Sequence, residues 1–451
     1  GLHKWYILKY DENVPFTKAG GSFENIPGVE YVEPVRAIKM DEAYNDLTDE
    51  LWGLDNKATK DFDINVLPVW ENYTMGNSDV IVSVVDNGVD IKHEDLAANC
   101  LTSGHYNAVD NNSNITVGSH GTHVAGTVAA VNNNGIGVCG VAGGDGTPGT
   151  GVRLMTCQLF SGNASCGTMS RAKAYKYAAD MGACVLQCSF GQASGLVKSD
   201  EEFKKFYSFE EEMLNYFMEH PSANNPVDKN FAIFASGNDA YHLAGYPAAH
   251  RDYIAVSAIG PDFLPAVYTN YGPGVTISAP GGDSSINMTA ESNRASILST
   301  VPSDCPAYDT DYGYMEGTSM ACPHVSGVVA LGLAYAKKLG KSFTYDEFLA
   351  MIYSSVNNLD YYIETSKKKS NGIDFDLTKY WQKMGTGAID TWRLYMQIEG
   401  TPCLAVQNGV ESKISLDQFF SPASSHLTFT KIEISDQARE TLGIEKEPYV
   451  K

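Results

Sequence analysis

The chain has 451 residues, of which 43% are hydrophobic and 19% are charged, a balance typical of a globular protein with one large domain and smaller attachments. Its formal net charge of -22 argues against nucleic acid as a partner, because phosphate binding needs clustered Lys and Arg. No run approaches the ~20 apolar residues of a membrane-spanning helix, and the first residues, GLHKWYILKY, lack a signal-peptide pattern. The composition therefore favours a soluble protein without a transmembrane segment.

The nine cysteines are odd in number, so at least one is unpaired. Most lie in apolar contexts such as GVCGV, MTCQL and ACVLQC, which is typical of buried small hydrophobic residues rather than of a disulfide framework. Cys184 and Cys188 would lie on one face of a strand, about 13 Å apart at ~3.3 Å per residue, too far to form a disulfide. The cysteines therefore leave the redox compartment open.

The first 42 residues differ in pattern from the rest of the chain. The runs KWYILKY and VEYVEPVRAIKM are separated by a turn and predict a small β-rich unit. We therefore expect a domain boundary near residue 42.

Six short apolar runs follow in the middle of the chain: VIVSVV, RLMTCQLF, ACVLQCSF, FAIFAS, YIAVSAIG and VTISAPG. Because they are continuous rather than alternating, they predict strands buried on both faces of a parallel sheet. Helical stretches lie among them: SRAKAYKYAADMG, DEEFKKFYSFEEEMLNYFMEH and SGVVALGLAYAKKLG. This alternation predicts an α/β fold with helices on both faces of the sheet and with its ligands at the carboxyl ends of the strands.

The pattern changes again near the C-terminus. GAIDTWRLYMQ predicts a last helix, and beyond Gly400 the runs SKISL and LTFTKIEI are β-like and polar. Some 50 residues are few for a complete β-sandwich, so we expect a β-rich segment that is part of a larger domain. The expected regions are residues 1–42, 43–398 and 399–451.

Three polar segments stand near the ends of these elements: DNGVDIKHEDL from Asp86, NSNITVGSHGTHVAGT around His120 and EGTSMACPH around Ser319. Asp, His and Ser are the components of a nucleophilic triad, in which the imidazole takes the serine proton and the carboxylate orients the imidazole. The glycine turn before Ser319, with Pro323 expected in the first helical turn, predicts that Ser319 lies at a helix N-terminus.

The segments VVDNGVDIKHEDL, SHGTHVAGTVAAVNNNGIGVCGVAG and GTSMACPHVSG resemble the signature segments of the subtilisin-like serine proteases, the subtilases, and their chain order is that of subtilisin. The resemblance covers about residues 46–397 and implies a three-layer α/β fold with a mostly parallel twisted sheet flanked by helices. It implies Ser319 as nucleophile, His120 as general base and Asp86 as orienting acid. Asn238, in FAIFASGND, would bind the oxyanion together with the Ser319 N–H. The implied activity is that of a serine endopeptidase.

The resemblance also implies contacts with an extended protein or peptide substrate. Ser189, Phe190 and Gly191, in CSFGQ, would line one wall of the pocket for the residue before the scissile bond, and Gly245 would set its depth. Recognition by main-chain pairing gives broad specificity. The alternative is that these are ordinary strand and turn residues.

Calcium is the metal that the resemblance implies. The loop VNNNGIGV matches the one with which subtilases hold Ca²⁺, and oxygen ligands suit Ca²⁺ better than Zn²⁺. The expected ligands are Asp46, Asp95, Val131, Asn134, Ile136 and Val138. Alternatively, asparagines hold this turn and Asp95 caps a helix. An HxxH metal pair, His120 with His123, would have no further Cys or His placed to complete it.

The segment PGVEYVEPVRAIKM resembles the end of the inhibitory prosegment of subtilases, which implies a cut between Val35 and Asn45; a free N-terminal hairpin is the alternative. From the family we expect a monomer that is secreted or located at the cell surface or in the periplasm. The competing hypothesis is a catalytically silent subtilase scaffold that serves in binding. The presence of all four catalytic residue types argues against it.

Overall fold

The computed structural model describes residues 44–59, 62–161, 164–165, 167–286, 292–303, 305–363 and 367–400. The expected N-terminal unit, residues 1–42, lies outside the described residues. So does the expected C-terminal segment beyond residue 400. Both therefore stay predictions.

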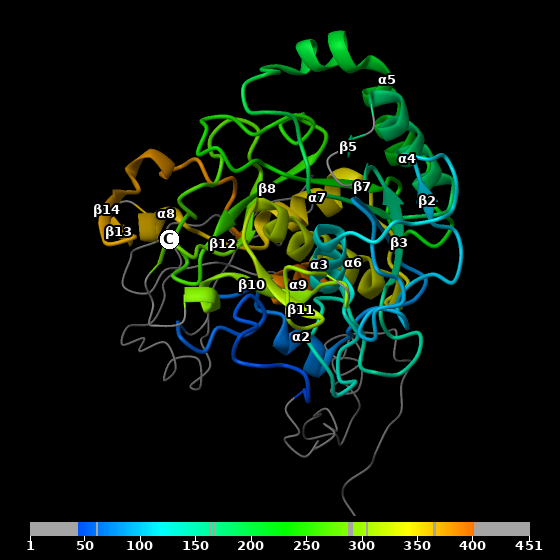
Figure 1. Cartoon of the computed structure of the whole chain (residues 1–451), viewed down its shortest axis with the longest axis horizontal. Helices are drawn as coiled ribbons and strands as arrows, with labels where there is room; N and C mark the ends of the chain where they lie inside the picture. Colours follow the sequence, from blue (N-terminus) through cyan, green and yellow to red (C-terminus); the bar gives the residue numbers. More distant parts are fainter. Residues whose placement is uncertain are drawn as a thin grey trace, which may run out of the picture. The chain divides into compact units, whose positions relative to one another are not determined.

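A nine-stranded sheet forms the centre of the domain (Figure 1). All neighbouring strands pair in parallel except the edge strand β12, which runs antiparallel to β15. The predicted mostly parallel sheet is therefore confirmed. In sheet order the strands are β12 (Val356–Asn357), β15 (Ala388–Ile389), β9 (Ile277–Pro280), β8 (Ile254–Ile259), β7 (Phe231–Ala235), β6 (Val185–Cys188), β1 (Ile81–Asp86), β3 (Arg153–Gln158) and β2 (Tyr106–Asn107).

Each of the six continuous apolar runs contributes a strand to this sheet. The strands β6, β7, β8 and β9 are buried at every residue, and β1 and β3 are buried at every residue but the first. Burial on both faces explains why the runs do not alternate with polar residues.

Helices flank the sheet in two closely packed pairs. α3 (Ser119–Ala129) packs against α6 (Thr318–Lys338), and α4 (Thr168–Asp180) packs against α5 (Asp200–Glu219) (Figure 1). The other helices in the described part of the chain are α2 (Leu67–Asn72), α7 (Tyr345–Ser354), α8 (Asp360–Ile363), α9 (Thr391–Glu399) and the 3₁₀ turns η2 (Ser292–Ala295) and η3 (Thr378–Tyr380).

Within the described residues, three antiparallel strand pairs lie outside the main sheet. β10 (Ile297–Thr300) pairs with β11 (Tyr312–Met315) and lies against α3. β13 (Lys367–Ser370) pairs with β14 (Ile373–Asp376). The pair of β4 (Phe160–Ser161) and β5 (Ala164–Ser165) follows β3.

The central helix α6 packs on α3 and on strands β6 to β9. Among the described residues, it is the helix that is long and apolar enough to cross a membrane, and 94% of its apolar window is buried by the rest of the domain. Such burial is typical of a core helix. All seven cysteines in the described part of the chain are free thiols.

The prediction that Pro323 lies in the first turn of this helix is wrong. The helix begins at Thr318, so Pro323 is its sixth residue. A proline there cannot donate a hydrogen bond to the carbonyl four residues earlier, which belongs to Ser319. The hydroxyl of Ser189 donates to that carbonyl instead, at 2.6 Å, so the position is satisfied from outside the helix.

Candidate active site

A hydrogen bond to the turn after β1 links the end of that strand to the first turn of α3. Asp86 is the last residue of β1, and the side-chain oxygen of Asn87 accepts a hydrogen bond from the N–H of Gly121 at 2.8 Å. The helix has no side-chain cap on Gly118, its N-cap residue, so Asn87 satisfies one of the N–H groups that a helix start leaves open. This link places the first turn of α3, with His120, over the end of β1.

Asp86 and His120 form a close pair. The Nδ1 atom of His120 lies 2.8 Å and 2.9 Å from the two carboxylate oxygens of Asp86. The Asp86 side chain is 3% exposed, whereas that of His120 is 34% exposed. Burial lowers the pKa of His120, but the charge of Asp86 and its hydrogen bond raise it, and the net result is a pKa above the usual value. A carboxylate on Nδ1 leaves Nε2 as the ring atom that can accept a proton.

Ser319 is the second residue of α6. Its Oγ donates a hydrogen bond to the carbonyl of Ser189 at 3.2 Å, and it makes no hydrogen bond to His120 in the described part of the chain. The two serines are thus joined twice, since Ser189 Oγ donates to the Ser319 carbonyl.

Asn238 lies shortly after β7, and its side chain is held by Thr318, the residue before Ser319. Its Oδ1 accepts hydrogen bonds from both the N–H and the hydroxyl of Thr318, each at 2.8 Å. Because the amide oxygen is engaged in this way, the Nδ2 donor is directed elsewhere and makes no hydrogen bond within the described residues. A Cβ built on Gly317 would lie 3.4 Å from this Nδ2 and 3.5 Å from the backbone N of Ser319, so both donors border one small volume.

The expected substrate residues lie on two segments that are joined by a hydrogen bond. The N–H of Gln192 donates to the carbonyl of Tyr246 at 2.8 Å. A Cβ on Gly245 would lie 3.0 Å from the Gln192 carbonyl oxygen, so only glycine fits this contact without a shift. Gly191 is exposed and lies next to Gln192.

Phe190 is half-buried between two other aromatic rings. Its centroid lies 5.8 Å from that of Phe160 and 6.1 Å from that of Phe234, both in edge-to-face geometry. Such contacts hold a ring in one orientation. The bulk of Phe190 is therefore part of a packed aromatic cluster.

The expected calcium residues lie close together. Asp95 accepts hydrogen bonds from Asn134 Nδ2 at 2.7 Å and from the N–H of Val138 at 3.0 Å. Its carbonyl accepts one from the N–H of Val131 at 2.9 Å. Burial raises the pKa of Asp95, these hydrogen bonds lower it and the negative charge of Asp46 raises it, and the net result is a pKa of about 7.

The donors around these acids are N–H and S–H groups. Asp46 accepts from the N–H of Asn134 at 3.0 Å and from the thiol of Cys139 at 2.9 Å, and Asn134 Oδ1 accepts from the N–H of Ile136. The described residues contain no group of three or more His, Cys, Asp or Glu that could hold a metal. The side-chain oxygens of Asp46, Asp95 and Asn134 nevertheless form the hard donor set that Ca²⁺ prefers.

His123 belongs to the core and not to a metal pair. It is fully buried, and its Nε2 lies 3.0 Å and 3.1 Å from the carbonyl oxygens of Ile297 and Gly313. Nε2 must therefore carry a hydrogen and donate it. Burial is the main cause that lowers the pKa of His123 to about 3.

Sequence reasoning missed three residues that position the site. Asn87 holds the start of α3, and Thr318 holds Asn238. Buried Gln187, in β6, donates to Ser189 Oγ at 2.7 Å and accepts from Cys322 and Ser326 of α6. The signal was the polar Gln187 inside the apolar run ACVLQCSF, since a buried amide needs partners.

Comparison with known proteins identifies the family. The profile of the Subtilase family matches residues 77–376, well over half of the chain. Halolysin from Haloferax mediterranei is 31% identical over 60% of this chain and 44% of its own length. An extracellular protease from Xanthomonas campestris pv. campestris is 31% identical over 68% of this chain and 52% of its own length. The chain thus spans less than two-thirds of the length of both relatives.

Among solved structures, a protease from Pseudoalteromonas arctica PAMC 21717 superposes with a TM-score of 0.59 at 25% identity. The match covers 79% of this chain and 99% of that one. Together with the parallel sheet and the family match over residues 77–376, this similarity shows that the chain belongs to the subtilase family.

Proposed function

We propose that the chain is a serine endopeptidase that hydrolyses peptide bonds through an acyl-enzyme. The observation that carries the proposal is the close pair of His120 Nδ1 and the buried Asp86 carboxylate, combined with Asn238 Nδ2 and the Ser319 N–H bordering one volume. The pair suits general base catalysis, and the two donors suit an oxyanion.

The reaction begins with a rotation of the Ser319 hydroxyl away from the Ser189 carbonyl, its present acceptor, toward His120. Ser319 Oγ then attacks the peptide carbonyl carbon while His120 Nε2 takes the hydroxyl proton. His120 gives that proton to the leaving amine, and Asp86 stabilises the imidazolium in between. Water hydrolyses the acyl-enzyme by the same path.

The substrate is an extended polypeptide that pairs with the backbone of Ser189, Phe190 and Gly191, and Gly245 limits the depth of the pocket for the residue before the scissile bond. Hydrogen bonds to the substrate main chain depend little on the substrate's side chains, which is why we propose broad specificity. Support comes from the double hydrogen bond between Ser189 and Ser319, which fixes this wall next to the nucleophile.

We test the triad by labelling the purified chain with a fluorophosphonate probe and measuring its intact mass. A single adduct is expected, and Ser319→Ala should abolish it. Ser354→Ala, at an exposed serine of α7, should label like the parent. If the full chain does not label, the assay is repeated on a chain that starts at Asn45, without the proposed prosegment. If that shorter chain does not label either, the proposed peptidase activity is contradicted and the catalytically silent scaffold is favoured.

The loop 131–138 with Asp46 and Asp95 is proposed as a structural calcium site. Asp46, Asp95 and Asn134 would hold Ca²⁺ with side-chain oxygens, and Val131, Ile136 and Val138 with carbonyls. A bound Ca²⁺ would offset the burial of the two acids and fix the loop after α3. It takes no part in the chemical step.

Thermal unfolding in Ca²⁺ and in EGTA tests this site. Ca²⁺ should raise the Tm of the parent, and Asp95→Asn should remove the increase. Asp374→Asn, at an exposed position of β14, should keep it. An equal increase in all three chains would place calcium elsewhere.

Export of the chain is proposed from its relatives, one of which is named an extracellular protease. Removal of the prosegment-like residues 1–42 and a monomeric mature form are proposed with it. The mass measurement above tests the cut, and sedimentation tests the oligomeric state.

A further inference from the structure

The hairpin of β13 and β14 lies on a hydrophobic cluster of its own. Its turn is Asn371–Gly372, with φ of 50° and 80°, and Asn-Gly favours the tight turn of a two-residue hairpin. The cluster consists of Ile259, Phe263, Leu359, Ile363, Leu377, Tyr380, Met384 and Ala388, and Phe375 of β14 packs against it. The hairpin is therefore anchored to the core and not a free extension.

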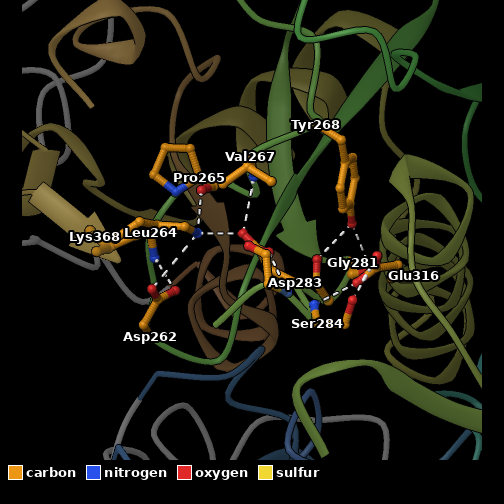
Figure 2. A network of polar contacts seen from close by, with 12 residues as sticks. Asp262, Leu264, Pro265, Val267, Tyr268, Gly281, Asp283, Ser284, Glu316 and Lys368 are labelled. Atoms are coloured by element: carbon orange, nitrogen blue, oxygen red, sulfur yellow. Dashed lines mark hydrogen bonds and ion pairs between the residues drawn. The ribbon is translucent and has the colours of Figure 1, made fainter. Parts of the chain in front are cut away.

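Lys368, in β13, is a buried cation. Its side chain is 3% exposed, whereas its neighbours Lys367 and Lys369 are exposed. Figure 2 shows its amine between three oxygens. It lies 2.6 Å from a carboxylate oxygen of Asp283, 2.6 Å from the carbonyl of Pro265 and 3.8 Å from a carboxylate oxygen of Asp262.

Asp283 is the centre of the loop that follows β9. Its side chain is 1% exposed and also accepts from the N–H of Val267 at 3.0 Å and from Ser285. The N–H of Asn371 in the hairpin turn donates to the Ser285 carbonyl at 2.9 Å. The hairpin thus holds the loop of residues 281–285 at two points, Asp283 and Ser285.

The same loop contacts the residues before the nucleophile. The N–H of Gly317 donates to the Gly281 carbonyl at 2.9 Å. Glu316 accepts from the N–H and the hydroxyl of Ser284 at 2.5 Å and 3.0 Å. Figure 2 shows the contact between Glu316 and Ser284 on the side of Asp283 opposite Lys368. The Lys368 amine is therefore connected to Gly317 through its contact with Asp283, the loop backbone from Asp283 to Gly281, and the hydrogen bond between Gly281 and Gly317.

The loop is also tied to the asparagine side of the candidate site. The Tyr268 hydroxyl donates to the carbonyls of Gly281 and Gly282 at 3.0 Å and 2.6 Å (Figure 2). The carbonyl of Tyr268 accepts from the N–H of Ala240, two residues after Asn238, at 2.7 Å. A shift of the loop would therefore reach both segments that border the proposed oxyanion site.

We infer that Lys368 is a positioning residue for the active site, and this inference rests on the proposed triad. By fixing Asp283, it holds the loop of residues 281–285, and the loop sets the position of Gly317 and so of the Ser319 N–H relative to Asn238. A buried ion pair is weak evidence for stability, because an apolar pair of similar volume is often as stable. Its directional hydrogen bonds, however, select one loop position, and a displacement of about 1 Å at a reacting centre lowers rates by about 10²-fold.

Lys368→Met tests this role, with Lys367→Met as a matched control in the same strand. We expect Lys368→Met to lower kcat and the fluorophosphonate labelling rate by about tenfold, with KM changed less than twofold. Lys367→Met should match the parent in all three. A folded Lys368→Met chain with the parent's kcat, measured well below its Tm, would overturn the positioning role.

A second variant acts at the exposed end of the network, where loss of folding is not expected. Glu316→Gln weakens the contact to Ser284, and we expect a smaller fall in kcat with an unchanged Tm. A kcat equal to the parent's would overturn the proposed path through the loop. If the parent itself does not label at Ser319 even when it starts at Asn45, the triad assignment fails and the role of Lys368 fails with it. A labelled parent with unaffected variants refutes the positioning role alone.

Discussion

Replacing Gly317 with alanine would test the proposed oxyanion site most directly. The residue has φ of 149° and ψ of 165°, a backbone region open almost only to glycine. The added Cβ would lie 3.4 Å from Asn238 Nδ2 and 3.5 Å from the Ser319 N. An oxyanion bound at about 2.7–3.1 Å from both donors would need the same volume.

The magnitude follows from how many donors the methyl group blocks. Losing one donor of this kind lowers kcat by about 10²–10³, a range known from subtilisin, and Gly317→Ala obstructs two. We therefore expect kcat to fall by at least about 10²-fold with little change in KM. The backbone strain should also lower the free energy of unfolding by about 1–3 kcal/mol.

The assay is steady-state hydrolysis of a chromogenic peptide by folded Gly317→Ala, with Asn238→Ala and the double variant for comparison. Because both changes act on one site, their effects should not add. A folded Gly317→Ala chain with kcat within threefold of the parent would refute the oxyanion assignment. Additive losses would mean that Gly317 acts through another part of the site.

Two further changes test other parts of the domain. Activity should fall as the pH drops through the raised pKa of His120, because the protonated ring cannot act as a base. Asp86→Asn removes the contributions that raise this pKa, so kcat should fall by about 10⁴-fold and the loss of activity on the acid side should occur at a lower pH. If the acid side of the pH profile did not shift in Asp86→Asn, the proposed pairing of Asp86 with His120 would be contradicted. Arg171→Met should lower the free energy of unfolding by about 3 kcal/mol, since it leaves Glu210, 1% exposed, without the cation 2.5 Å away; urea unfolding measures this. Lys176→Met, at an exposed pair, should cause no measurable change, and equal effects would contradict the burial argument.

The sequence predicted the sheet well because burial on two faces leaves a strong local pattern. The six apolar runs correspond to β1, β3, β6, β7, β8 and β9. Asp86 could be placed at a strand end because a polar residue directly follows an apolar run. The expected helices α4, α5, α6 and α9 form for the same local reasons.

Features that depend on tertiary contacts could not be predicted. The direction of the Ser319 hydroxyl is set by the carbonyl of Ser189, 130 residues earlier in the chain. Lys368 lies in a run of three lysines, and only the packing of the hairpin decides that the middle one is buried. Asn371–Gly372 and the alternating run IDFD of β14 were local signals for that hairpin, but β13, with the run KKKS, contains no apolar residue to complete the pattern.

The proline inside α6 has a consequence for how catalysis responds to the substrate. Because Pro323 cannot bond to the Ser319 carbonyl, that carbonyl is held by Ser189. The proposed pocket wall and the proposed nucleophile are thus linked by hydrogen bonds, so a substrate side chain that pushes the wall outward should also displace Ser319. Poorly fitting substrates should therefore be bound almost normally yet turned over slowly, so that selectivity is expressed in kcat more than in KM.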